Sequence, residues 1–381
     1  MSDWLPIVVL PNVTAVEPID MHDIALTNRV DPRVKVACRR HPRLRTLLRR
    51  FKTAFGDSVE PSVLIVREGT PDTLLETAAV AGFRDAMAIS LFTGGRALLI
   101  SHDSSMSRPI WAETLTLYPW MLDRHGEDMI ASTPSMLGVH VVERFRGQSA
   151  AGLSHSDIDN ADLDAPLFAE LSQRWSSRFG GGEVSWDDRA LFRSLNMAYQ
   201  ASMMPGGQEA QFYDIGRLIM LWASAFEILL HTGPEGASGK LQVMDLLDSA
   251  DWYDTRLSAK EHEVRISKKT VQTRTLPSLL YSKIDALRSD FIHGNDVAAD
   301  QLVTSDGTHY LHVAAVLYRC ALAAKLGIKR PQFEDNEEDD DTEIDQAEFL
   351  DHFNQWSFWK EPQTRHERAL LKAAELPEDE D

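Results

Sequence analysis

The sequence predicts an α+β protein: a mixed α/β domain at the N-terminus, an all-α helical bundle after it, and an acidic, disordered C-terminal tail. Short β-rich apolar runs alternate with helical patterns up to residue 180. From residue 185 to 328 the apolar residues follow helical spacing alone. Residues 332–381 contain 18 Asp and Glu against 4 Lys and Arg, which is −14 of the net charge of −19.

The bulk composition is that of an ordinary globular protein. The chain has 381 residues, of which 43% are hydrophobic and 25% charged, enough for two domains with hydrophobic cores. Because −14 of the net −19 belongs to the tail, the rest of the chain carries only −5. The acidity therefore does not exclude a nucleic-acid surface on the body. The two cysteines, Cys38 and Cys320, predict no disulfide framework and indicate a reducing compartment.

The first residues, MSDWLPIVVLPNV, have no basic start, and their apolar stretch is short and interrupted by proline. They predict neither a signal peptide nor a membrane span. We expect a cytoplasmic protein without membrane association, metal or cofactor.

Residues 1–180 are assigned to the N-terminal domain. Its predicted elements are, in chain order, a strand at 62–68, a helix at 70–92, strands at 96–101 and 138–145, and a glycine-rich linker at 178–183. The helix at 70–92 is expected to start with Thr70 as its cap and Pro71 at its first position.

A basic run, RVDPRVKVACRRHPRLRTLLRRFK, occupies residues 29–52 and holds ten Arg and Lys residues. Nucleic-acid phosphates would dock on such a run through salt-dependent contacts. Alternatively it is a solvated helix face whose apolar side packs on the domain; that side comprises Leu44, Leu47, Leu48 and Phe51. Both interpretations stay open.

Residues 185–328 are assigned to an antiparallel helical bundle. Helices are predicted at 185–204, 208–233, 239–253, 276–293 and 308–327. Ser185 with Asp188 three residues later forms a capping-box pattern, and Gly327 is a natural stop. A charged loop separates the third and fourth helices, and its cations are Arg265, Lys268, Lys269 and Arg274.

The tail, residues 332–381, begins with a low-complexity acidic stretch at 334–345, which predicts disorder. The aromatic segment FLDHFNQWSFWK at 349–360 follows it. That segment is either a docking element or a helix packed back on the body.

The candidate catalytic pair is Arg288 and His293, in ALRSDFIHGND near the end of the fourth bundle helix. The spacing alone is weak, because 28 Arg and 13 His in 381 residues give about one such pair by chance. A second pair, Arg96 and His102, lies within and after a predicted strand. The end of an apolar helix and a glycine stop favour the first pair.

His309 and His312 share a helix face, but no further ligand completes a metal site.

The motif LLYSKIDALRSDFIHGND, together with LWASAFEILL at 221–230, resembles the HEPN superfamily and, within it, the Apea-like branch. The signature of HEPN proteins is Arg, four to six residues, then His, and a long apolar helix with an acidic residue, here Glu227, precedes the motif helix. The resemblance covers about residues 185–328. Many members have Asn after the Arg, where this chain has Ser289, whose hydroxyl keeps some hydrogen-bonding capacity. Supporting roles fall to Ser289, Asp290, Glu227 and Asn295.

The resemblance implies a metal-independent endoribonuclease in which the RNA 2′-OH attacks the adjacent phosphate and leaves a 2′,3′-cyclic phosphate. His293 would move protons, because the pKa of an ordinary histidine lies closest to neutrality. Arg288 would stabilise the negative charge that grows on the phosphorus oxygens. Family association suggests a role in anti-phage defence or toxin-like growth arrest.

Helical geometry constrains this pair, because positions five apart diverge by about 140° on a regular helix. Either the helix ends or kinks near Asp290, or two chains contribute to one site, as is typical of the HEPN family. We expect a homodimer with a composite site. In the structural alternative, Arg288 pairs with Asp285 or Glu227, and His293 caps the last carbonyls of the helix.

The expected partners are RNA, guided by the cationic loop, and a phage-derived trigger or partner protein at the N-terminal domain. The acidic tail is a candidate competitor for the RNA surface. The alternative function is a non-catalytic RNA-binding or dimerisation module built on the same bundle.

Overall fold

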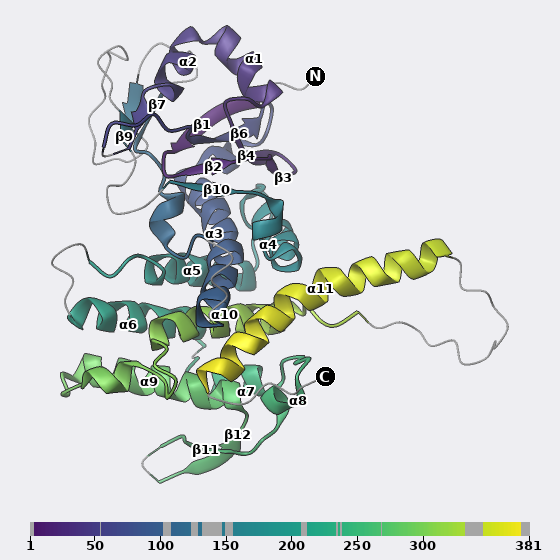
Figure 1. Ribbon diagram of the computed structural model, residues 1–381. Coiled ribbons are helices and arrows are strands. Elements are labelled where there is room, and N and C mark those ends of the chain that lie inside the picture. The colour runs from purple at the N-terminus through teal and green to yellow at the C-terminus, as the bar shows by residue number, and fades with distance from the viewer. Residues whose placement is uncertain are drawn as a thin grey trace.

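The computed structural model describes residues 4–53, 55–101, 108–122, 129–131, 147–148, 155–206, 212–233, 235–236, 238–267, 269–331 and 346–374. It is an α+β fold in which an N-terminal antiparallel sheet with helices lies above a stack of helices (Figure 1). The predicted fold class is confirmed in these two parts. The strand predicted at 138–145 lies outside the described residues. Within the described ranges, no helix is long and apolar enough to cross a lipid bilayer.

The main sheet has four antiparallel strands in the order β1-β6-β4-β3, with bounds Trp4–Leu10, Ser62–Arg67, Ile24–Asn28 and Ile19–Met21. The central strand β6 confirms the strand predicted at 62–68. Its alternate side chains enter two different cores: Val63 and Ile65 pack under the first two helices, whereas Leu64 and Val66 face the helical body. A strand buried on both faces is expected to be apolar throughout, as this one is.

Short elements complete the N-terminal part. The helices α1 (Pro32–Arg40) and α2 (Pro42–Leu48) cover one face of the sheet. The remaining strands are β2 (Val13–Ala15), β5 (Phe51–Lys52), β7 (Trp120–Leu122), β8 (Met129–Ala131), β9 (Gly147–Gln148) and β10 (Ser156–Ile158). They form the pairs β2–β10, β5–β9 and β7–β8.

The helix α3 corrects two predictions at once. It runs unbroken over Thr77–Ile100, so the strand predicted at 96–101 is wrong, and its N-cap is Glu76 rather than Thr70. Pro71 precedes a separate 3₁₀ turn, Asp72–Leu75. Because α3 is surrounded by other helices, nearly all of its side chains are buried. A short apolar run of this kind does not distinguish a strand from a buried helix.

The helices of the body are α4 (Ala165–Phe179), α5 (Trp186–Ala201), α6 (Phe212–Leu229), α7 (Lys240–Asp248), α8 (Thr255–Ser258), α9 (Leu276–His293) and α10 (Tyr310–Leu326). Five of them correspond to the predicted helices, whereas α4 and α8 were not predicted. The 3₁₀ turns are Ala112–Leu115, Asn160–Asp162 and Ala299–Leu302. The hydroxyl of Ser185 accepts the N–H of Asp188, which confirms Ser185 as the cap, and the same hydroxyl donates to the carboxylate of Asp188 at 2.6 Å. Gly327 ends α10 in the left-handed conformation with φ 73°.

One hydrophobic core continues across the predicted linker at 178–183. α3 packs against α4, α5 and α10, so helices on both sides of the linker share buried neighbours (Figure 1). The division at residue 180 therefore falls between two helices, α4 and α5, that share a continuous core.

The charged loop predicted before α9 is in fact a β-hairpin. β11 (His262–Arg265) pairs antiparallel with β12 (Val271–Arg274). Val264 is only 1% exposed and anchors the hairpin among the helices. In β11 the buried Val264 lies between two exposed charged residues, Glu263 and Arg265, as expected of a strand with one buried face. The many charged residues of this segment led to the prediction of a loop.

The predicted disorder of the whole tail is wrong for its C-terminal part. Residues 332–345 lie outside the described ranges, but Gln346–Ala373 forms the helix α11. Its C-terminal half packs on α3 and α10 through apolar residues such as Leu370, and Trp359 is 3% exposed. The aromatic segment at 349–360 is helical, and it packs on the body only at its end, because Leu350, Phe353 and Phe358 are 50–56% exposed.

A buried polar cluster fastens α11 to the body. Arg319 of α10 donates from Nε to Asp164 at 2.6 Å, and both side chains are at most 1% exposed. The same guanidinium donates to Gln363 of α11, whose amide donates to Glu367 at 2.6 Å. The acidic composition of residues 332–381 does not reveal this network, because its cation lies on a different helix.

Candidate functional site

The helix α9 carries the candidate pair, and both of its ends are defined by local chemistry. Thr275 caps the start by accepting the N–H of Ser278. Gly294 adopts the left-handed conformation with φ 68° just after His293. The backbone N–H of Asn295 donates to the carbonyl of Asp290 at 2.9 Å, which closes the helix as a Schellman motif does. The predicted helix end at His293 is confirmed.

Arg288 is held in an ion-pair cluster between α9 and α6. Its Nη1 donates to Oε1 of Glu227 at 2.7 Å and lies 3.6 Å from Oδ1 of Asp285. The side chain of Arg288 is 27% exposed, so its charge reaches the surface. Both contacts use Nη1, which leaves Nη2 and Nε without a partner among the described residues.

Lys240, at the start of α7, extends this cluster. Its ammonium lies 3.3 Å from Oδ2 of Asp285 and donates to the backbone carbonyl of Arg265 at 3.2 Å. Partial burial raises the pKa of Glu227, and the charge of Arg288 opposes that rise. The charges of Glu227 and Asp285 thus balance those of Arg288 and Lys240. The contacts to Glu227 and Asp285 hold the side chain of Arg288 between α9 and α6.

His293 lies on a different face of α9 from Arg288. The helix is continuous from Leu276 to His293, so it neither ends nor kinks near Asp290. Residues five apart then point about 140° away from each other. Ser289, one turn before His293, shares its face, and both residues are exposed. Within one chain the structure does not bring Arg288 and His293 together.

The supporting residues separate into two groups. Glu227 contacts Arg288, as one alternative predicted. Asp290 and Asn295 hold the helix end, because the side-chain amide of Asn295 donates to Oδ1 of Asp290 at 2.8 Å. Both therefore belong to the helix end beside His293, and the contacts described for them do not include Arg288.

Tyr281 belongs to the Arg288 cluster, although its sequence context did not identify it. Its hydroxyl is buried and has no hydrogen-bond partner among the described residues. Burial, with Asp285 and Glu227 nearby, raises the pKa of Tyr281 well above its ordinary value. The signal was available, because residues 281, 285 and 288 follow the i, i+4, i+7 spacing of one helix face.

The predicted RNA-binding cations do not behave alike. Arg265 and Lys269 are exposed on the hairpin, and Lys268 lies outside the described residues. Arg274 donates to Asp245 at 2.6 Å and to Asp248 at 2.9 Å, and its side chain is 13% exposed. Because two aspartates neutralise Arg274, the structure gives it a role in holding the hairpin to α7.

The second Arg–His pair has a structural role as far as it is described. Arg96 is fully buried in α3 and donates to the carbonyls of Leu311 at 3.0 Å and Ser202 at 3.3 Å. His102 lies outside the described residues.

His312 packs on Trp111 with ring centroids 5.8 Å apart, and burial lowers its pKa to about 3. The described residues hold no group of three His, Cys, Asp or Glu placed to bind a metal.

Comparison of this chain with protein families, with curated proteins and with solved structures finds no match. The residues and their geometry are therefore the basis for any assignment of function.

Proposed function

We propose that this chain is a metal-independent endoribonuclease of the HEPN type that acts as a homodimer in the cytoplasm. One observation supports this most: α9 ends at an exposed His293, while Arg288 is anchored on another face by Glu227 of α6. The resemblance implies these two features, an acidic residue on the preceding helix and a histidine just before a glycine stop. A second copy is needed to complete the site, because one continuous helix separates the pair by about 140°.

The chemistry assigned to the composite site is transesterification. The imidazole of His293 from one copy takes the proton of the RNA 2′-OH, and the 2′ oxygen forms a bond to the neighbouring phosphorus. The bond from phosphorus to the 5′ oxygen breaks, and that oxygen takes a proton from solvent water, while the imidazolium of His293 later returns its proton to solvent. Arg288 of the other copy faces the non-bridging oxygens as their charge grows. The products are a 2′,3′-cyclic phosphate and a 5′-hydroxyl end.

We expect the purified protein to cleave single-stranded RNA in the presence of EDTA and to leave intact an RNA with one 2′-deoxy nucleotide at the cleavage position. The 2′ oxygen is the nucleophile, so its removal blocks the step entirely. Mass spectrometry of the fragments reads out the cyclic phosphate. Cleavage at the 2′-deoxy position, or cleavage that EDTA abolishes, would contradict the proposal.

A specific observation favours the second candidate, a non-catalytic RNA-binding or dimerisation module. Arg288 is engaged by Glu227 and Asp285, the arrangement of a structural ion pair. This module would bind RNA through Arg265 and Lys269 of the hairpin without cleaving it. Binding without cleavage, equal in the wild type and in His293→Ala, would favour the module over the nuclease.

A further inference from the structure

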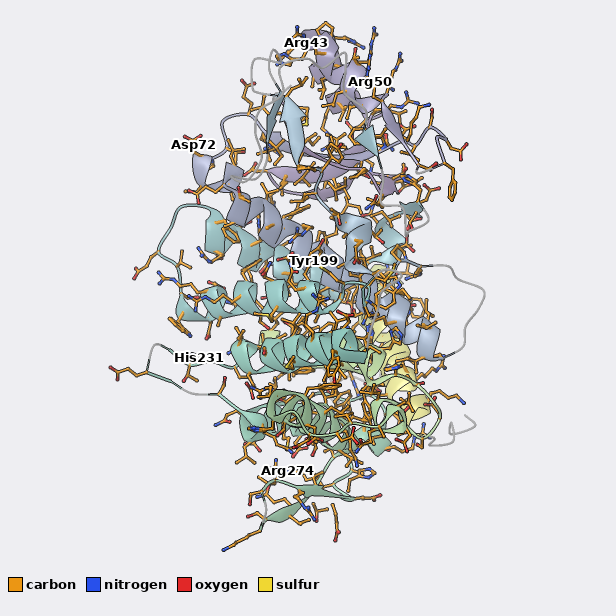
Figure 2. All side chains as sticks on the ribbon, turned by 90° about the vertical axis from the view of Figure 1, so that its left-hand side faces the viewer. Arg43, Arg50, Asp72, Tyr199, His231 and Arg274 are labelled. Atoms are coloured by element: carbon orange, nitrogen blue, oxygen red, sulfur yellow. The ribbon has the colours of Figure 1, made fainter. Side chains whose placement is uncertain are left out.

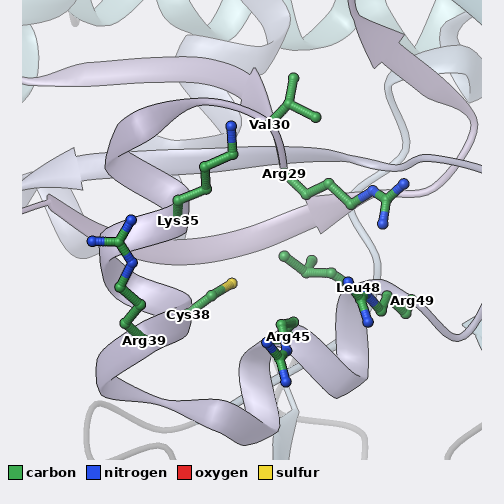
Figure 3. Close-up of a pocket in the computed structure, with 8 residues that line it drawn as sticks. All are labelled: Arg29, Val30, Lys35, Cys38, Arg39, Arg45, Leu48 and Arg49. Atoms are coloured by element: carbon green, nitrogen blue, oxygen red, sulfur yellow. The ribbon is translucent and has the colours of Figure 1, made fainter.

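A cationic pocket of about 370 Å³ lies at the end of the molecule opposite α9, between α1, α2 and the segment after β4. Its lining residues are Arg29, Val30, Lys35, Cys38, Arg39, Arg45, Leu48 and Arg49 (Figure 3). No carboxylate is among them. Figure 2 shows Arg43 and Arg50 of the same region at one end of the molecule and Arg274 of the hairpin at the other. This pocket is therefore separate from the site on α9.

The sequence builds the pocket by breaking one basic run into two short helices. α1 ends at Arg40, and Pro42 starts α2 after a single residue. Leu44 and Leu47 are at most 3% exposed and pack beneath the helices. The apolar side of the run is thus buried as the solvated-face interpretation predicted, and the turn at Pro42 folds the basic sides of the two helices around a hollow.

The cations without partners are concentrated in this hollow. Arg33 pairs with Asp31 at 2.8 Å, and Arg29 with Glu60 at 3.1 Å. Within residues 29–52, the cations that have no ion-pair or hydrogen-bond partner among the described residues all line the pocket: Lys35, Arg39, Arg45 and Arg49. Cations gathered without a carboxylate repel one another, and a bound anion relieves that repulsion.

We propose that this pocket binds the phosphate chain of a small phosphorylated ligand, of the class of nucleoside di- and triphosphates. A triphosphate carries about four negative charges near neutral pH, because its terminal phosphate contributes nearly two. That charge matches the four cations without partners. A hollow of 370 Å³ lies within the range of ligand pockets. Its concave shape suits a compact anion, and Val30, which is 54% exposed, offers apolar contact to a nucleoside.

Cys38 provides a reporter inside the pocket. Its thiol points into the hollow (Figure 3), and the residue is half-buried. Burial raises the pKa of this thiol, while Arg45 and Arg49 oppose the rise. The chain has two cysteines, and the other, Cys320, is 2% exposed, with its pKa raised by burial to about 12. Alkylation of the folded protein therefore reports on Cys38.

The test measures binding of tripolyphosphate and of ATP to the full chain by calorimetry at low ionic strength, and the rate of Cys38 alkylation with and without each probe. We expect both probes to bind and to slow alkylation. Arg39→Glu combined with Arg45→Glu should weaken binding at least about tenfold, because charge-assisted hydrogen bonds are lost and repulsion is added. Tighter binding of ATP than of tripolyphosphate would assign a share of the affinity to contacts of the nucleoside with Val30.

The matched control is Arg40→Glu combined with Arg43→Glu, which makes the same change of charge on the same two helices outside the pocket lining. It should keep at least half of the affinity. Circular dichroism checks the fold of both variants, and Arg39→Lys with Arg45→Lys, which keeps the charge, should restore most of the binding.

Three results would overturn the proposal. The first is that neither probe binds the wild type, and the second is that both charge-reversal variants lose affinity equally. The third is that a short RNA with a 5′-hydroxyl end binds through Arg39 and Arg45 while tripolyphosphate does not compete with it. That third result would assign the surface to an RNA backbone instead. None of these outcomes depends on the chemistry of α9.

Discussion

Replacing His293 with alanine is expected to slow RNA cleavage about a hundred- to ten-thousandfold, the range for loss of a general acid–base group. The residue is exposed at the last position of α9, and no described side chain depends on it for packing. The loss should therefore appear in the rate of the chemical step and not in the stability of the fold. The measurement is single-turnover cleavage of RNA in EDTA, with thermal unfolding followed in parallel.

A histidine far from α9 provides the control. His22 is exposed in the turn before β4 and has φ 44°, a conformation that asparagine also tolerates. His22→Asn should cleave RNA at the wild-type rate. Cleavage by His293→Ala at the rate of this control would remove His293 from the reaction.

Replacing Asp164 with asparagine is expected to lower the free energy of unfolding by about 3–5 kcal/mol, the cost of leaving a buried charge without its partner. Asp164 accepts from Arg319 at 2.6 Å, and the side chain of Arg319 is fully buried. Asparagine keeps an oxygen for the N-cap of α4, so the change isolates the charge. Urea unfolding of the full chain measures the effect.

The comparison variant is Asp187→Asn, which breaks the surface pair with Lys325 at 3.6 Å, where Asp187 is 60% exposed. It should change the free energy of unfolding by less than about 1 kcal/mol. If the two substitutions lowered the free energy of unfolding equally, the buried pair of Asp164 and Arg319 would contribute no more to stability than a surface pair.

The effect of Asp164 also has a defined pH dependence. Burial would raise the pKa of this carboxyl, but Arg319 holds it below its ordinary value. A carboxyl with a lowered pKa stabilises the fold at pH above its unfolded value, about 3.9, and loses that contribution as the pH falls through the folded value. The difference between the wild type and Asp164→Asn should therefore shrink as the solution is made strongly acidic.

The sequence predicted the fold best where local chemistry determines an element. Ser185, Gly294 and Gly327 mark helix ends that the structure confirms, because caps and left-handed glycines act within one turn. The prediction failed for residues 96–101, since a buried run gives no periodicity to separate strand from helix. It also failed for α11, whose burial depends on Arg319 from another helix. Tertiary contacts decide such segments.

The candidate site shows the same limit. The contact between Glu227 and Arg288 was expected, because a lone acid on an apolar helix needs a cationic partner. The contact between Lys240 and Asp285 was not expected, because it depends on how α7 packs against α9. In the same way, the basic run at 29–52 was visible in the sequence, but only the turn at Pro42 makes it a pocket.

The central claim is that Arg288 of one chain and His293 of another act on the same phosphate. A heterodimer of Arg288→Ala and His293→Ala chains, isolated through two different affinity tags, tests it most directly. Each parent homodimer lacks a complete site, whereas the heterodimer retains one of its two composite sites. We predict that it cleaves RNA at about half the wild-type rate, as two-fold symmetry requires. A heterodimer as inactive as its parents would contradict the composite site.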